Sequence, residues 1–281
     1  MRQNKPSFFS QLWVLTVRSF DILSNDIKHL GMLIVLPILS AIVIIMVGKE
    51  EAFLNYEATQ VNIFSIVCAV IFIGIFNSIQ DVCNERSILK REYMTNLRLD
   101  AYICSKLITQ FVICSFQTLI ITIMFFRNFD FPLQGIVFYS SAIDGYVTIL
   151  LLMLASAMTG IFISSIVRSA EVANLVAPIV ILLQIVFSDN LTDLKGTLEK
   201  ISYFMLSRWG MSGLSAISRL NEQKSTIQLL FPTFPLEIER EINYASTNEY
   251  LIKVWLVLII FSLVFTFLSG IVISNVSKDS R

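Results

Sequence analysis

Long runs of apolar residues, separated by shorter polar stretches, set the pattern of this chain. A helix needs about 20 largely apolar residues to cross the hydrocarbon layer of a membrane. Continuous runs favour helices over the strands of a membrane barrel, which alternate at every second residue. The pattern predicts an all-α membrane protein with six transmembrane helices. The six runs are residues 30–47, 63–80, 103–126, 143–167, 172–187 and 251–274.

The fifth run is the shortest and contains Pro178. A membrane helix tolerates an internal proline where neighbouring helices satisfy the freed carbonyl, and a short one where the bilayer thins. A long segment of mixed polarity, residues 188–250, separates this run from the last one. We expect that segment to lie mainly outside the lipid.

The first 29 residues have a different pattern from the rest of the chain. Seven residues in this segment are spaced by three, four or seven positions, which is the period of a helix with one apolar face. They are Phe9, Leu12, Trp13, Thr16, Phe20, Leu23 and Ile27. Such a helix lies along a membrane interface. We therefore divide the chain into an amphipathic elbow helix, residues 1–29, and a six-span transmembrane domain, residues 30–281. The elbow is either a simple anchor or also a contact for a cytoplasmic partner.

The loop between the second and third runs, residues 82–102, is unusually charged. The stretch from 84 to 106 holds five basic and three acidic residues. Glu85 and Leu89, like Ile88 and Glu92, are one helical turn apart. The spacing predicts a short helix over 84–93, a break near Thr95 and a new helix from residue 100. The alternative is a basic loop whose side chains extend to the lipid surface.

Lysine and arginine are distributed unequally between the two sides of the predicted spans. With a cytoplasmic N-terminus, 12 of the 21 basic residues fall in the inner segments, and the two short outer loops hold only Lys49 and Arg127. Cytoplasmic loops of membrane proteins carry such an excess. We expect a multi-pass protein of the cell membrane with both termini in the cytoplasm. Segment 188–250 is then extracellular.

Composition narrows the classes of function. Hydrophobic residues make up 55% of the chain and charged residues 15%, with a mean hydropathy of +0.73. The formal net charge of zero disfavours nucleic acid as a partner. The sequence has no phosphate-binding loop of the P-loop type, and His29 is its only histidine. No catalytic residue, cofactor site or metal site is predicted in this chain, and membrane lipid is its main surrounding.

Two stretches of the sequence resemble the type-2 ABC transporter permeases, especially the G subfamily. The first has the pattern Glu-Arg, then Arg-Glu-Tyr, then a span that opens with Tyr and Lys. These residues are Glu85, Arg86, Arg91, Glu92, Tyr93, Tyr102 and Lys106. The second, around Ser207-Arg208-Trp209, resembles the segment that forms a re-entrant helix before the last span, although the usual proline is absent. The order of elbow, five spans, long outer segment and sixth span also agrees.

The resemblance implies a transport subunit without an ATPase site of its own. A separate cytoplasmic ABC ATPase subunit would bind ATP and Mg, and a second permease copy, identical or homologous, would complete the transporter. The loop over 82–102 would contain the cytoplasmic coupling helix. The residues that the resemblance implies to dock into the ATPase are Glu85, Arg86, Lys90, Arg91 and Glu92. Export of an amphiphilic or hydrophobic substrate is the expected function.

Polar residues inside the spans have two interpretations. Asn77, Gln80, Gln117, Asn174 and Gln184 either join helices by hydrogen bonds or line a path for the cargo. We predict that the path between two protomers is lined by Phe111, Gln117, Ile121, Ile181 and Gln184. The alternative function, a carrier or channel outside the ABC class, is disfavoured because no charged residue falls in the middle of a span.

Overall fold

The computed structural model describes residues 7–48, 56–94, 97–129, 131–188, 196–223 and 244–278. In these ranges the chain is helical apart from turns and one isolated bridge between Gln134 and Ser140. Five of the described helices are long and apolar enough to cross a membrane. They are α2 (Ile27–Val47), α3 (Tyr56–Ser78), α5 (Leu99–Asn128), α6 (Ser141–Ile166) and α11 (Asn248–Lys278). The all-α prediction is confirmed.

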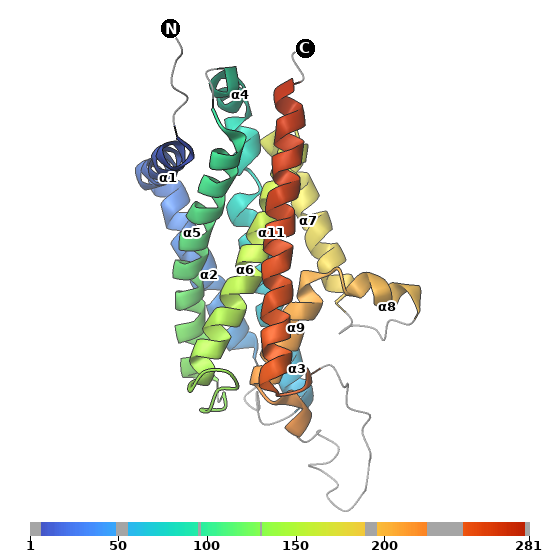
Figure 1. The fold of residues 1–281 in the computed structure, drawn as a ribbon. Coiled ribbons are helices and arrows are strands. Elements are labelled where there is room, and N and C mark those ends of the chain that lie inside the picture. The colour runs from blue at the N-terminus through green and yellow to red at the C-terminus, as the bar shows by residue number, and fades with distance from the viewer. Residues whose placement is uncertain are drawn as a thin grey trace, which may run out of the picture.

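The remaining predicted span coincides with α7 (Ala170–Val186), a shorter apolar helix of 17 residues. At 1.5 Å per residue it is about 26 Å long, less than the roughly 30 Å of a hydrocarbon core. Figure 1 shows α9 (Leu206–Ile217) continuing along the bundle beyond α7, while α8 (Thr197–Ser202) points sideways between them. The segment predicted to form a re-entrant helix coincides with α9. The short α7 is therefore followed along the bundle by α9 and has no further turns of its own.

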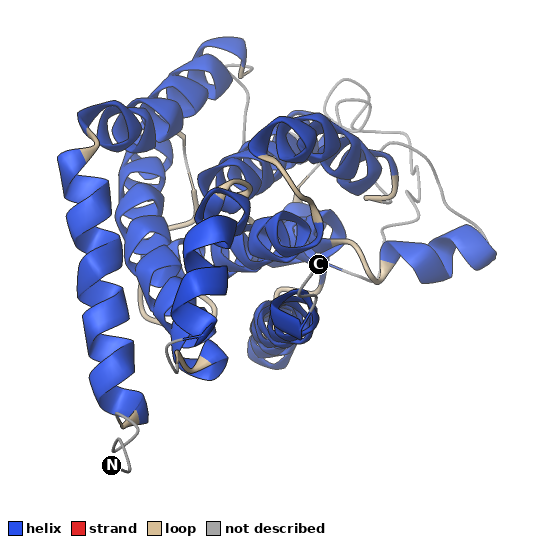
Figure 2. Ribbon diagram, turned by 90° about the horizontal axis from the view of Figure 1, so that it is seen from above, coloured by secondary structure: helices blue, strands red, loops and turns tan. Residues whose placement is uncertain are grey.

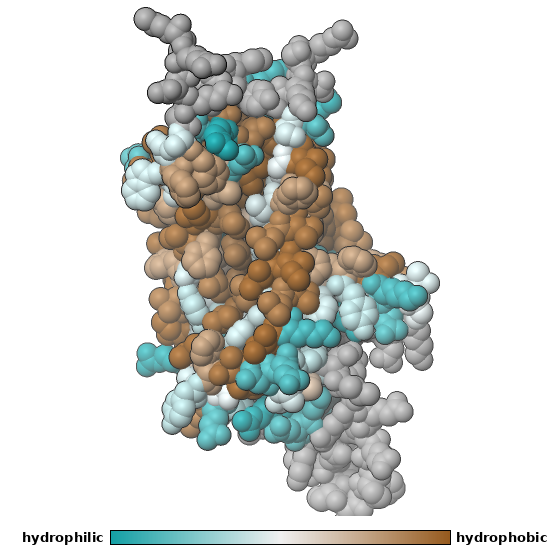
Figure 3. Space-filling view, viewed as in Figure 1, coloured by the Kyte–Doolittle hydropathy of each residue, from teal (hydrophilic) through white to brown (hydrophobic). Residues whose placement is uncertain are grey.

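The centre of the bundle is α6, most of whose residues are buried. It packs against α3, α5, α9 and α11 (Figure 1). Close approach to α3 depends on Gly74, where a Cβ atom would lie 2.7 Å from the Met153 backbone oxygen. Figure 3 shows a broad apolar surface along α11, with hydrophilic residues gathered toward the ends of the molecule. That distribution fits a bundle surrounded by lipid.

The N-terminal helix α1 (Phe8–Asn25) crosses the bundle axis rather than following it. Figure 2 shows it lying lengthwise along one side of the bundle. Ser7 caps its first turn, where the Ser10 amide donates to the Ser7 hydroxyl at 3.3 Å. Leu15 faces the protein, whereas Phe9 and Trp13 are largely exposed. A single residue, Asp26, separates α1 from α2. A helix therefore lies within the predicted elbow segment, and its place along a membrane interface stays a prediction.

Candidate functional site

The charged loop forms helix α4 (Asp81–Met94), which follows α3 after a two-residue turn. This confirms the predicted helix over 84–93 and extends it at its start. The predicted break near Thr95 lies outside the described residues, and the next helix begins at Leu99, one position before the predicted start. Figure 1 shows α4 at the same end of the bundle as α1 and the last turns of α11.

A side chain from α6 caps the first turn of α4. The Ser164 hydroxyl accepts hydrogen bonds from the backbone amides of Val82 and Cys83, each at 3.1 Å. The first amides of a helix have no partner within the helix, and a serine oxygen is a favoured acceptor for them. The cap comes from a residue some 80 positions away, so α4 is fixed directly to the central helix of the bundle. Sequence reasoning did not identify Ser164.

Glu85 holds α4 against α5. One carboxylate oxygen accepts from the Tyr102 hydroxyl at 2.7 Å, and the other from the Lys106 ammonium at 2.9 Å. The Lys106 side chain is only 8% exposed and that of Glu85 20%. Removing one member of a buried pair leaves the other charge uncompensated, which is strongly destabilising. Glu85 therefore positions α4, and both of its oxygens are engaged within the chain.

The other four predicted coupling residues divide into two groups. Arg86 donates to the Val167 carbonyl at 2.6 Å, at the carboxyl end of α6, where a cation is favoured by the helix dipole. Glu92 accepts from Arg18 of α1 at 2.5 Å. Lys90 and Arg91 have exposed side chains at the far part of α4. Glu85, Arg86 and Glu92 thus each bond to another element, and the side chains of Lys90 and Arg91 are exposed.

The amide side chains in the predicted spans join helices. Asn77 of α3 donates to Gln117 of α5 at 2.5 Å, and Gln117 donates to the backbone of α2 at 2.8 Å. Gln80 donates to Asn174 of α7 at 2.8 Å. Gln184 accepts from the first backbone amide of α9 at 2.8 Å, which fixes α9 to the end of α7. The interpretation of these five residues as interhelical hydrogen-bonding groups is confirmed.

The five residues predicted to line a path do not come together in one chain. Gln117, Ile121, Ile181 and Gln184 are buried inside the bundle, and Phe111 is exposed. Phe111 lines an apolar groove of about 250 Å³ between α5, α6 and α11. Lining by this set of five residues stays a prediction, since it concerns an assembly of two chains.

A larger groove of about 560 Å³ lies between α2, α3 and α7, and we call it the α3 groove. Phe72 and Phe76 of α3 line it as a pair, with ring centroids 4.4 Å apart. The amides of Asn77, Gln80 and Asn174 lie along the same groove. Sequence reasoning missed the two phenylalanines, although their spacing of four residues beside Asn77 and Gln80 was a visible signal of one shared helix face.

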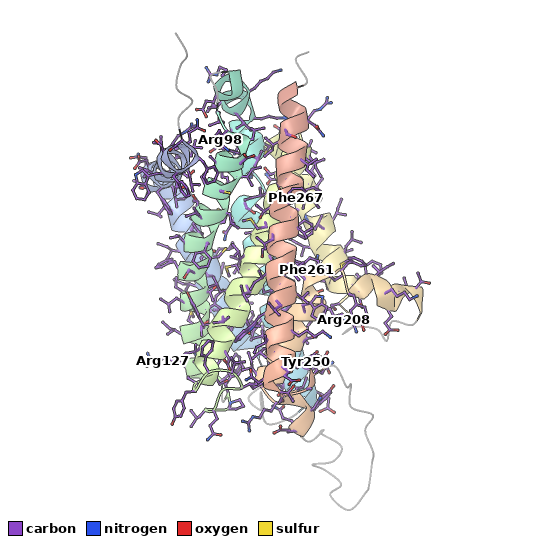
Figure 4. The ribbon with its side chains drawn as sticks, viewed as in Figure 1. Arg98, Arg127, Arg208, Tyr250, Phe261 and Phe267 are labelled. Carbon is purple, nitrogen blue, oxygen red and sulfur yellow. The ribbon has the colours of Figure 1, made fainter. Side chains whose placement is uncertain are left out.

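The buried environment of Arg208 was also not predicted from the sequence. Its guanidinium is buried, donates to the Ser202 hydroxyl and lies over the Tyr203 ring, 4.0 Å from the ring centroid. Figure 4 shows Arg208 where α8 meets α9. The residue therefore fastens the sideways α8 to the start of α9. In the described ranges no group of three His, Cys, Asp or Glu side chains could hold a metal ion.

Comparison with known proteins agrees with this architecture. Residues 10–218 match the family described as ABC-2 type transporter. The chain is also 26% identical, over 221 residues, to an ABC transporter ATP-binding/permease protein of Mycobacterium tuberculosis. That alignment covers 75% of this chain and 25% of the relative, so the chain spans about a quarter of the relative's length. The family match includes most of the bundle together with α1, α4 and α9, and the chain belongs to the ABC-2 type transporter family of membrane proteins.

Proposed function

We propose that this chain is the permease subunit of an ABC exporter, driven by a separate cytoplasmic ATPase subunit that binds ATP and Mg. The observation that carries the proposal is the attachment of α4. A charged helix at one end of the bundle is fixed to α5 through Glu85 and to α6 through Arg86 and Ser164. Such a helix can transmit a displacement to the membrane helices without bending first.

The proposed orientation puts α1, α4 and both termini in the cytoplasm and α8 and α9 on the outer side. It rests on the excess of basic residues in the segments assigned to the inside and on the position of α4 at one end of the bundle (Figure 1). In this topology α7, although short, is the fifth of six spans. A carrier or channel outside the ABC class is no longer favoured, because the chain belongs to an ABC family.

Within α4 we assign two roles. Lys90 and Arg91, which are exposed, would contact the ATPase. Glu85, Arg86 and Glu92 would act as positioning residues, since each already bonds to another element of this chain. The division revises the expectation that all five residues dock directly.

Charge reversal separates these roles. Lys90→Glu with Arg91→Glu should leave membrane levels unchanged but prevent co-purification of the ABC ATPase that accompanies the tagged wild-type chain. The matched control is Arg127→Glu with Lys200→Glu, two exposed residues on α5 and α8 that lie away from α4 (Figure 1). The control should retain the ATPase and transport. Full association of the ATPase with the Lys90 and Arg91 variant would refute the assignment.

For the cargo we propose an amphiphilic or hydrophobic compound that binds in the α3 groove. The paired Phe72 and Phe76 rings offer an apolar surface, and the neighbouring amides offer hydrogen bonds. Few precisely placed polar groups in an apolar cleft are typical of small-molecule sites. A second permease copy facing this groove would close it, as expected for a two-fold assembly.

A pair of matched variants tests the location of the path. Phe76→Ala should lower transport several-fold while leaving chain levels unchanged, because it removes one wall of the α3 groove. Phe111→Ala removes an exposed ring of the same kind on another face and should have little effect. The opposite result would favour the path that the sequence predicts through Phe111.

A further inference from the structure

A hydrogen bond between two amide side chains crosses one end of the α3 groove. The Gln80 Nε2 atom, in the turn between α3 and α4, donates to the Asn174 Oδ1 atom near the start of α7 at 2.8 Å. Both residues line the groove. Gln80 directly precedes Asp81, the first residue of α4. The contact therefore lies at the end of the groove next to α4, and we call it the amide bridge.

The amide bridge lies between α4 and the two aromatic rings of the groove. Phe72, Phe76 and Gln80 are spaced by four residues, so they follow one another along one helix face. The helical pattern continues into the turn, since the Ile79 amide donates to the Ile75 carbonyl at 3.0 Å. A molecule that enters the groove from the α4 end would therefore meet the amide bridge before it meets the paired rings.

The exposure of the amide bridge allows it to open at low cost. Gln80 is half-buried and Asn174 is exposed, so water can replace the lost partner of each amide. Asn77 and Gln117 make a similar contact inside the bundle, but they are only 6% and 0% exposed. Breaking that contact would leave buried amides unsatisfied, which is costly. The buried pair thus suits a permanent joint, and the amide bridge suits a contact that opens and closes.

The position of Gln80 depends on α4. Its backbone carbonyl accepts from the Asn84 amide at 3.1 Å, so Gln80 belongs to the hydrogen-bond pattern that begins α4. Asn174 belongs to a different helix, and most side chains of that helix are not buried. Such limited packing does not force α7 to follow α4. A displacement of α4 would therefore change the separation of the two amides.

We propose that the amide bridge is a gate at the α4 end of the α3 groove, and that displacement of α4 opens and closes it. This inference rests on the proposed function, in which the groove holds the cargo and α4 receives the movement of the ATPase. In the closed state Gln80 and Asn174 bond to each other across the entrance. In the open state both amides can bond to the polar part of a cargo that enters.

The first test measures entry into the groove and needs neither the cargo nor the ATPase. The full chain, with Phe72→Cys as a reporter in a background without native cysteines, is reconstituted in nanodiscs. The probe is the membrane-impermeant thiol reagent MTSET, which must reach the reporter cysteine through water. Gln80→Ala or Asn174→Ala should each raise the reaction rate about two- to tenfold, the range expected for the loss of one hydrogen bond between neutral groups.

A control and a rescue distinguish a gate from general loosening of the bundle. Asn25→Ala also removes an exposed amide, but that amide bonds within its own helix α1, so the rate should stay unchanged. The exchange of Gln80→Asn with Asn174→Gln keeps the summed length of the two side chains and should restore the slow reaction. A wild-type rate in both alanine variants would refute the gate. So would an exchange variant that reacts as fast as the alanine variants.

The second test examines the control by α4. In the reporter chain co-purified with its ABC ATPase, a non-hydrolysable ATP analogue should change the MTSET rate by about twofold or more, and Gln80→Ala should abolish this response. An equal response with and without the amide bridge would show that α4 does not act through it.

These outcomes separate the gate from the proposed function. Faster MTSET entry in the alanine variants, combined with normal transport by Phe76→Ala, would support the gate and contradict the groove as the cargo site. Unchanged MTSET entry, combined with reduced transport by Phe76→Ala, would refute the gate and leave the cargo site in place.

Discussion

The buried ion pair between Glu85 and Lys106 should contribute far more to stability than the exposed pair between Arg98 and Asp100. The atoms of the first pair are 2.9 Å apart, and its side chains are 20% and 8% exposed. Those of the second are 3.6 Å apart, with Arg98 48% and Asp100 76% exposed. Surface pairs contribute roughly 0–1 kcal/mol, whereas breaking a buried pair by removing one partner costs about 3–5 kcal/mol.

Lys106→Met should therefore destabilise the chain by about 3 kcal/mol, because Glu85 would keep only the Tyr102 hydroxyl as a partner among the described residues. Adding Glu85→Gln should recover part of that loss, since the uncompensated charge is then gone. The surface variants Arg98→Met and Asp100→Asn should each change stability by no more than about 0.5 kcal/mol. The free energy of unfolding is measured in mixed micelles as the fraction of denaturing detergent rises.

The coupling energy from each double-mutant cycle is the decisive quantity. We expect about 2 kcal/mol or more for Glu85 and Lys106, and less than about 0.5 kcal/mol for the exposed pair. Equal coupling energies would show that α4 is not held by a desolvated contact. In that case α4 would not be rigidly attached to α5.

Three further outcomes are expected. Gly74→Ala should destabilise the chain by about 1–3 kcal/mol, because the new Cβ would lie 2.7 Å from a backbone oxygen of α6, whereas Gly31→Ala meets nothing within 4 Å and should be neutral or slightly stabilising in the same unfolding assay. Asp144→Asn should speed amide exchange over residues 136–138, whose three amides donate to this carboxylate at 2.6–3.1 Å, because an amide group cannot accept from all of them; unchanged exchange would contradict this reading. In a background without native cysteines, Arg127→Cys should react with an impermeant maleimide in intact cells and Ser87→Cys only after permeabilisation, and the reverse pattern would invert the proposed orientation.

Much of the helical architecture could be predicted because it depends on local pattern. A run of apolar residues specifies a membrane helix wherever it packs, which is why all six predicted runs coincide with helices of the structure. The helix α4 was also predictable, since charges one turn apart on a short segment are a local signal. The observed boundaries of α4 differ from the predicted ones by a few residues, because the cap on its first turn comes from Ser164 of another helix.

Partnerships between distant residues could not be predicted in the same way. Glu85 and Lys106 both resembled surface coupling or snorkelling residues in the sequence, and only the packing of α4 on α5 shows that they pair. The amides of Gln117 and Gln184 fitted either a path or a hydrogen bond. Their burial inside one chain depends on how α5 and α7 are rotated, which the nearly uniform apolar character of membrane helices does not encode.

The Ser164 cap has a mechanical consequence. Because α6 supplies the acceptor for the first amides of α4, rotation of α4 about its own axis would have to break those bonds or carry α6 with it. The helix α6 touches α3, α5, α9 and α11 along its length. A torque applied to α4 would therefore tilt the central helix α6 instead of stretching a loop. Because α9 packs against α6, α9 would move together with it.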